Sequence, residues 1–456
     1  MNKINDFASA LCLHCFLFVQ PFKKNIRLIL KTIYFLKLSF LYLKKDYEGI
    51  LKNHCLLIRN NLAPYKKSIN HDLFILKTAK KFKLDILKHL PENPHQPKIM
   101  LLMSDIYDSG GHTEVALRYI KAFKNEFPVY FCLSALDGSS CKKVHVKSDL
   151  IKSLCGGYFE AGQEMTPREK ITFIYNNIIA NKITTLYAII NPADSICCAV
   201  MGLIKKNTGI KIIFYNHASH CFSLGTEFAD VILTRCRNSK PITPYLKNKT
   251  NALYIPFMSE PEQKKYSQKE IENFKKRLNI KNGAFVTLTG APLHKTDTGY
   301  FKMISKILSE HKNVCHILAA KANAQMTKTI SSFAGANKDR FIITPPVADF
   351  NMFAEISDLY IDSFPQGSAL TLVDFIKHSK PVVIKKNFKN SLKSFELYLF
   401  EEYPYTCCDD SEMFEKISKL ITDKTEYEKI CLAVQKHYIS EYNIETVKNM
   451  HRKLIQ

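Results

Sequence analysis

The residues best suited to chemistry in this chain lie in one turn and in the helix predicted after it. Gln366 and Gly367 follow an apolar run of strand length, and the helical pattern after them ends before Lys380-Pro381. A glycine there lets the backbone approach a ligand closely, and the first N–H groups of a helix favour phosphate. We therefore predict that Ser368 caps this helix. The predicted phosphate donors are the N–H groups of Ser368, Ala369, Leu370 and Thr371.

Two side chains near this turn could bind other parts of a nucleotide. Asp374, two turns into the helical pattern, is an acceptor that could hold the hydroxyl pair of a ribose, and Gln366 is an uncharged donor and acceptor at the edge of the turn. The apolar runs 359–361 and 382–384 lie on either side of the helix. This order predicts a strand, a turn, a helix and a second buried parallel strand.

A second glycine turn follows the strand pattern at 285–289. Gly290 ends that pattern, and Lys295 comes five residues later. A lysine here could place its positive charge on a leaving diphosphate, as group transfer demands. The alternative is an ordinary solvated lysine on the protein surface.

Polar residues also follow two predicted strands in the first half of the chain. Asp105 and the pair Gly110-Gly111 come after the run 99–103, and Glu114 lies at the start of the next helical pattern. His217 and His220 come after the run 211–215, and imidazole exchanges protons near neutral pH. His217 is the first choice because it lies nearer the strand, although loop histidines are often merely solvent-exposed.

Strand and helix patterns alternate from Lys98 onward, which predicts the α/β class with parallel sheets. Ligands of such sheets bind beyond the carboxyl ends of the strands. A polar stretch without pattern begins near residue 259 and divides the alternation in two. We predict a basic helical extension over 1–97, a Rossmann-like domain over 98–258 and a second one over 259–456.

The extension carries much of the positive charge. The whole chain has a net charge of +23, and residues 1–97 contribute 17 Lys/Arg against 6 Asp/Glu, or +11. Residues 7–19 are apolar but short for a membrane span, whereas 22–45 mix lysines with Leu, Phe and Tyr. This pattern is typical of an interfacial helix, so we predict an anionic membrane surface as partner of residues 1–45. The open alternative is that the helix packs on the rest of the protein.

Cysteine usage indicates a reducing compartment. The fourteen cysteines show no disulfide spacing, and Cys12 and Cys15 form a lone C-x-x-C pair without the second pair that zinc needs. We therefore predict no metal site. The charge also raises the possibility of nucleic acid as partner, but no basic motif interleaved with aromatic residues stands out, so none is predicted.

Together these segments resemble glycosyltransferases of the GT-B type over residues 98–456. The Gly110-Gly111 turn with Glu114 is similar to the opening helix of glycosyltransferase family 4. Gln366 and Asp374 stand eight apart, where that family has two glutamates, and the family's arginine position reads Ala291. The run GSALTLVD is also similar to the O-GlcNAc-transferase-like group.

This resemblance implies two Rossmann-like domains facing across a cleft and transfer of a sugar from a nucleotide-diphosphate sugar, with UDP or GDP as carrier. It implies that Asp374 binds the ribose and Lys295 the diphosphate, that His217 assists near the sugar, and that Glu114 or Asp105 borders the acceptor. No cofactor or bound metal is expected. Family 4 would imply retention of configuration and the other group inversion, and the residues do not decide between them.

The charge suggests where the acceptor lies. We expect a cytoplasmic, peripheral protein on the inner face of the cell membrane, with a glycan or lipid-linked acceptor of bacterial lipopolysaccharide or capsule synthesis. Two other functions remain open from the sequence. One is a catalytically inactive GT-B-like binding protein, for which Ala291 and Gln366 speak, and the other is a glycerophosphate transferase of similar fold.

Overall fold

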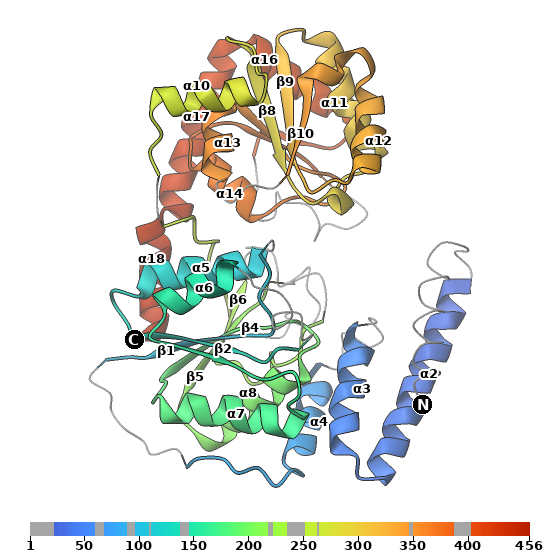
Figure 1. Cartoon of the computed structure of the whole chain (residues 1–456), viewed down its shortest axis with the longest axis vertical. Coiled ribbons are helices and arrows are strands. Elements are labelled where there is room, and N and C mark those ends of the chain that lie inside the picture. The colour runs from blue at the N-terminus through green and yellow to red at the C-terminus, as the bar shows by residue number, and fades with distance from the viewer. Residues whose placement is uncertain are drawn as a thin grey trace.

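The computed structural model contains two α/β domains, with helices of the extension beside the first (Figure 1). It describes residues 22–59, 68–88, 96–108, 111–136, 146–217, 222–234, 251–261, 264–345, 350–386 and 403–456. Among these residues, no helix combines the length and the apolar character needed to cross a membrane.

The first domain is built on a seven-stranded parallel sheet in the order β3-β2-β1-β4-β5-β6-β7. Its strands are β1 (Ile99–Met103), β2 (Val129–Leu133), β3 (Gly157–Glu160), β4 (Thr185–Ile189), β5 (Lys211–Tyr215), β6 (Val231–Thr234) and β7 (Ala252–Tyr254). The helices between them are α5 (Gly111–Phe123), α6 (Val146–Leu154), α7 (Pro167–Ala180) and α8 (Ser195–Asn207). All five residues of β1 are buried, as expected for a strand covered by helices on both faces.

The second domain has a six-stranded parallel sheet in the order β10-β9-β8-β11-β12-β13. Its strands are β8 (Phe285–Gly290), β9 (Val314–Ala319), β10 (Phe341–Thr344), β11 (Leu359–Ile361), β12 (Val382–Lys385) and β13 (Thr406–Cys407). Its helices are α10 (Gln268–Arg277), α11 (Thr298–Glu310), α12 (Ala324–Ala334), α13 (Phe350–Ile356), α14 (Leu370–Ile376), α16 (Asp410–Thr422) and α17 (Lys424–His437). The predicted α/β class with two parallel sheets is confirmed.

The described part of the extension divides into two. Helices α3 (Tyr47–Arg59) and α4 (Ser68–Ala79) pack against α8 and share a core with the first domain. Asp72 on α4 is fully buried and accepts hydrogen bonds from the backbone N–H groups of Gly225 (2.9 Å) and Glu227 (3.0 Å). These two helices are therefore part of the core of the first domain.

Helix α2 (Phe22–Leu43) contacts α3 but leaves large apolar side chains exposed. Leu38 is buried, whereas Ile33, Leu36, Phe40 and Leu43 are 48–80% exposed. Spacings of three and four residues place these four on one side of the helix. The predicted apolar segment at 7–19 and the Cys12–Cys15 pair lie outside the described residues.

The chain ends by crossing back to the first domain, as the red ribbon in Figure 1 shows. After the turn η6 (Tyr438–Tyr442), helix α18 (Ile444–Ile455) packs against α5. His451 is fully buried, with Nε2 2.6 Å from the Tyr119 hydroxyl and Nδ1 3.3 Å from that of Tyr187. Arg452 makes two hydrogen bonds of 2.7 Å to Glu126. The final helix of the chain therefore lies on the first domain.

Candidate active site between the two domains

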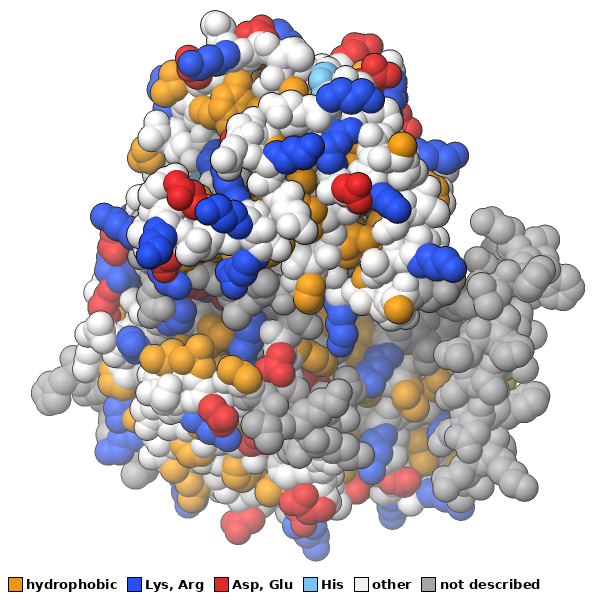
Figure 2. Space-filling model, turned by 45° about the horizontal axis from the view of Figure 1, so that its top comes forward, with side chains coloured by type: hydrophobic (Ala, Val, Ile, Leu, Met, Phe, Trp, Pro, Cys, Tyr) orange, Lys and Arg blue, Asp and Glu red, His pale blue; other side chains and the backbone are white. Residues whose placement is uncertain are grey.

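The starts of helices α5 and α14 meet where the two domains face each other. A Cβ built on Gly111, the first residue of α5, would lie 3.7 Å from Leu370 Cδ1 at the start of α14. Figure 2 shows a shaded recess between the two lobes, with Lys and Arg side chains along it. The first residue of α5 and the start of α14 therefore lie at one interface.

A buried carboxylate organises the turn before α14. Asp362 follows β11, and its Oδ1 accepts three hydrogen bonds: from Ser363 N (3.0 Å), Ser368 N (2.8 Å) and Ser368 Oγ (2.6 Å). The prediction that Ser368 caps the helix is therefore wrong. The helix begins at Leu370, with Ala369 at the cap position and no side-chain cap. Ser368 lies one residue too early to cap it, held in the turn because its N–H and hydroxyl both donate to Asp362. Since the N–H of Ser368 is also used by Asp362, it is not open to phosphate as predicted.

Burial raises the pKa of Asp362 to about 6. The hydrogen bonds from Ser368 and the positive charge of Lys295 act against this rise. Asp362 Oδ2 has no hydrogen-bond partner within the part of the chain that the structure describes. The turn is thus built around a carboxyl that titrates closer to neutral pH than an exposed aspartate does.

Lys295 lies against the same turn. It is half-buried, and its Nζ donates to the carbonyl of Gly367 at 3.0 Å, while the N–H of Gln366 donates to the carbonyl of Lys295 at 3.3 Å. Burial lowers the pKa of the ammonium, and Asp362 opposes that shift. Lys295 is therefore held next to Gly367 and is not the freely solvated lysine that the sequence left open.

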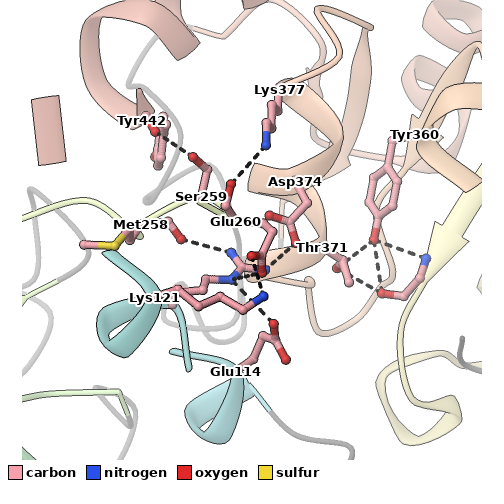
Figure 3. Close-up of polar contacts among 12 residues, drawn as sticks. Glu114, Lys121, Met258, Ser259, Glu260, Tyr360, Thr371, Asp374, Lys377 and Tyr442 are labelled. Atoms are coloured by element: carbon pink, nitrogen blue, oxygen red, sulfur yellow. Dashed lines mark hydrogen bonds and ion pairs between the residues drawn. The ribbon is translucent and has the colours of Figure 1, made fainter. Parts of the chain in front are cut away.

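The Tyr360 hydroxyl forms hydrogen bonds with both the Gly290 turn and the start of α14 (Figure 3). It lies 2.9 Å from Ser368 Oγ, 3.2 Å from Thr371 Oγ1 and 3.2 Å from the carbonyl oxygen of Gly290. Thr371 Oγ1 donates to the same carbonyl at 3.1 Å. Gly290, which was predicted in a different turn from Ser368 and Thr371, thus belongs to one hydrogen-bonded cluster with them.

Asp374 is bound by the first domain. Arg118 on α5 donates through Nη2 to Asp374 Oδ2 at 2.6 Å and through Nη1 to the carbonyl of Met258 at 2.9 Å (Figure 3). Burial raises the pKa of Asp374, and the positive charge of Arg118 opposes the rise. The carboxylate that was predicted to hold a ribose is therefore paired across the domain interface in this structure.

Glu114 belongs to the same charged network on α5. Its carboxylate lies 2.7 Å from Lys147 Nζ and 3.8 Å from Arg118 Nε. Burial acts to raise the pKa of Glu114, but Lys147 and Arg118 outweigh it and the pKa is lowered. One turn after Arg118, Lys121 Nζ lies 2.9 Å from the Glu260 carboxylate. Glu114 is thus held as a carboxylate and can accept hydrogen bonds.

His217 and His112 lie together at the carboxyl end of the first sheet. Their ring centroids are 5.4 Å apart, and the Tyr107 ring lies 5.0 Å from His112. Burial lowers the pKa of His112, because the protonated imidazole is less well solvated there. His112, the second residue of α5, was not predicted as a site residue.

The other predicted residues lie at different depths. Asp105 is buried just after β1, and Gln366 is half-buried in the turn before α14. Gly110 and His220 lie outside the described residues. Nowhere in the described ranges do three or more His, Cys, Asp or Glu side chains form a group that could hold a metal ion.

Sequence reasoning missed Arg118, His112, Tyr360 and Asp362. Asp362 had a usable signal, because it follows a buried strand immediately before the glycine turn. Arg118 had none, because an arginine among the apolar residues of α5 resembles any solvent-facing helix position. Its partner is 256 residues away in the chain.

Comparison with solved structures identifies the fold. The chain is similar to an O-GlcNAc transferase of Thermobaculum terrenum, with 10% identity, TM-score 0.56, and coverage of 90% of this chain and 76% of that one. It is also similar to Anabaena Alr3699/HepE in complex with UDP and glucose (14% identity, TM-score 0.63, 79% and 99% coverage). A glycosyltransferase of Rickettsia africae gives 12% identity, TM-score 0.61, and 79% and 98% coverage. The chain therefore has the GT-B fold, whereas no protein-family model and no curated protein sequence matches it.

Proposed function

We propose that this protein is a glycosyltransferase that moves a sugar from a nucleotide-diphosphate sugar to a hydroxyl acceptor. One observation carries the proposal: Lys295 and the start of α14 lie in one cluster that faces the start of α5. A cation and helix N–H groups stabilise the charge that develops on a departing diphosphate. The histidines and Glu114 of the first domain supply groups that can handle the proton of an acceptor hydroxyl.

Each part of the site has an assigned role. Lys295 and the N–H groups of Ala369, Leu370 and Thr371 bind the diphosphate, and Gly290 and Gly367 allow the close approach. Asp374 binds the ribose. His217, with His112 beside it, acts near the transferred sugar. Glu114 or Asp105 borders the acceptor.

The donor is a UDP- or GDP-sugar, and the reaction needs no cofactor or bound metal. The solved structure of Alr3699/HepE with UDP and glucose supports a uridine nucleotide in this fold. UDP-GlcNAc 2-epimerases, such as the Neisseria meningitidis enzyme bound to UDP-GlcNAc, share the fold at a TM-score of 0.54. This similarity supports the binding of a nucleotide sugar, which is common to transferases and epimerases.

The test of the site is a comparison of two lysines. We expect the full chain to release UDP or GDP from a matching sugar donor, and Lys295→Ala to lower that rate by about 10²–10³-fold, the usual effect of losing one group that stabilises developing charge. Lys321→Ala removes an exposed lysine of the same domain and is the control. Full turnover in Lys295→Ala would refute the assignment. Donor binding without turnover in the unmodified protein would favour the binding-protein alternative.

We further propose that α2 holds the protein on an anionic membrane surface, where the acceptor is a lipid-linked glycan of bacterial lipopolysaccharide or capsule synthesis. The exposed side of α2 carries Leu36, Phe40 and Leu43, and Lys44 and Lys45 follow at once. Apolar side chains can enter the headgroup region while lysines pair with anionic lipid. The proposal therefore includes a peripheral location at the inner face of the cell membrane.

Vesicle sedimentation tests this placement. The triple variant Leu36→Gln, Phe40→Gln, Leu43→Gln should lose most of its binding to vesicles containing phosphatidylserine. Leu432 and Ile439 are also more than half exposed but lie near the C-terminus, so their change to Gln is the matched control. Equal binding by the triple variant and the unmodified protein would remove the basis for the proposal.

A further inference from the structure

The ion pair between Arg118 and Asp374 joins the two domains at the residue assigned to the donor ribose. Both oxygens of that carboxylate are buried: Oδ2 accepts from Arg118 at 2.6 Å, and Oδ1 has no hydrogen-bond partner within the described ranges. The Asp374 side chain is only 9% exposed. A ribose hydroxyl cannot reach a carboxylate that the protein covers, so ribose binding requires this contact to open.

Arg118 has other partners already in place on its own side of the interface. Its Nη1 donates to the carbonyl of Met258, and its Nε lies 3.8 Å from Glu114 Oε1 and 3.9 Å from Glu260 Oε2. Breaking a buried ion pair is costly mainly because it leaves an uncompensated charge. Two carboxylates around the guanidinium avoid that cost on the arginine side, and a hydrogen-bonding ligand avoids it on the aspartate side.

The pair lies beside the segment that connects the domains. Lys377, on the turn after Asp374, donates to the carbonyl of Glu260 at 3.0 Å. The neighbouring Ser259 contacts the crossing segment. Its Oγ lies 3.0 Å from the Tyr438 hydroxyl and donates to the carbonyl of Tyr442 at 3.2 Å, the contact drawn in Figure 3. The Arg118–Asp374 pair therefore lies next to the contacts between the linker and the crossing segment. Opening it there allows a small rearrangement to change the orientation of one domain relative to the other.

We propose that Arg118 and the donor ribose compete for Asp374, so that the ion pair is a latch between the domains which the nucleotide opens. This inference rests on the proposed function, because that function assigns the ribose to Asp374. The ligand that opens the latch is a nucleoside diphosphate with free 2′ and 3′ hydroxyls. Binding of that ligand is weakened in the unmodified protein, because only the unlatched fraction can accept it.

The experiment measures the dissociation constant of UDP, and of GDP in parallel, by calorimetry on the full chain. Arg118→Gln should bind the preferred nucleotide about ten-fold more tightly, as expected when a latched state populated to about 90% is removed. Arg118→Lys keeps a positive charge near Asp374 but lacks the second guanidinium nitrogen that donates to Met258. Its affinity for the nucleotide should therefore lie between those of the unmodified protein and Arg118→Gln. Lys121→Gln removes another interface cation of α5, which pairs with Glu260, and should leave the affinity within about two-fold.

The ribose requirement separates a latch from a general loosening of the interface. With the 2′,3′-dideoxy form of the nucleotide that binds more tightly, the gain in affinity of Arg118→Gln should disappear. If the unmodified protein binds UDP or GDP and Arg118→Gln binds it equally or less tightly, the latch is refuted while the proposed function stands. If neither nucleotide binds any form, the proposed function itself fails. Should Arg118→Gln not fold, Arg118→Lys carries the same comparison: tighter binding supports the latch, and unchanged binding overturns it.

Discussion

Asp362 places a titrating carboxyl at the centre of the proposed donor site. One oxygen receives three hydrogen bonds from the turn, and burial raises the pKa of the group to about 6. A carboxyl whose pKa is higher in the folded than in the unfolded protein stabilises the fold while it is protonated. Its contribution is complete below the unfolded pKa of 3.8 and is lost as the pH rises through about 6.

Asp362→Asn tests this directly, because it removes the titration and keeps one acceptor oxygen. The difference in unfolding free energy between wild type and Asp362→Asn should fall, to the disadvantage of wild type, as the pH rises from about 4 to about 7. Urea unfolding across that range measures it. Asp149→Asn, at an exposed carboxylate of the first domain, is the control. A difference that stays constant with pH would show that Asp362 does not titrate there.

Gly290 is constrained by packing. A Cβ at this position would lie 2.8 Å from Phe350 Cε2 and 3.6 Å from Thr371 Cγ2. We expect Gly290→Ala to lower the melting temperature, with a destabilisation of about 1–3 kcal/mol from overpacking. Gly209→Ala, where a Cβ would meet nothing within 4 Å, should stay within about 0.5 kcal/mol of wild type. Equal melting temperatures for the two variants would contradict the packing argument.

At the level of the elements, the sequence predicts the positions of strands and helices better than it predicts which side chains contact one another. The strands 99–103, 211–215 and 359–361 were read correctly, because buried parallel strands are uninterrupted apolar runs. The edge strand β3 was missed, since GYFE is short and all four of its residues are only half-buried. Regularity along the chain reveals an element, whereas weakly buried edge elements leave little signal.

The candidate site was predictable to the same extent. Gly290, Lys295, Gly367 and Thr371 were found because turns after strands have a recognisable composition. The contacts of Ser368 with Asp362 and of Arg118 with Asp374 were not, because each depends on a carboxylate becoming buried in the tertiary structure. Both hydrogen bonds to Asp362 hold Ser368 in the turn, and the cap position falls to Ala369.

Helix α18 is attached to the first domain by buried polar contacts. His451→Ala would remove the contacts of the imidazole with the Tyr119 and Tyr187 hydroxyls and open a cavity, at a cost of about 2–5 kcal/mol. Thermal unfolding and limited proteolysis near the C-terminus should both show the loss. Lys453→Ala, at an exposed position on the same helix, should behave as wild type. Wild-type stability in His451→Ala would mean that α18 is held by other contacts.

For the whole molecule, the net charge of +23 should make binding to an anionic membrane depend on salt. Binding to phosphatidylserine vesicles should weaken steeply when salt rises from about 0.1 M, where the Debye length is about 10 Å, to about 0.5 M. Residual binding at high salt measures the apolar contribution of α2 and should be absent from the Leu36, Phe40, Leu43 triple variant. Salt-independent binding would indicate that charge has no part in the association. Neutral phosphatidylcholine vesicles are the reference.

The return of α18 has a consequence for biosynthesis. The first domain receives His451 and Arg452 from a helix that is translated only after the whole second domain. While the ribosome is still making the second domain, the surface around Tyr119 and Glu126 is not yet covered, because α18 has not been translated. The nascent first domain must therefore persist without its final helix, and a ribosome that stalls inside the second domain leaves an incomplete surface exposed to chaperones and proteases.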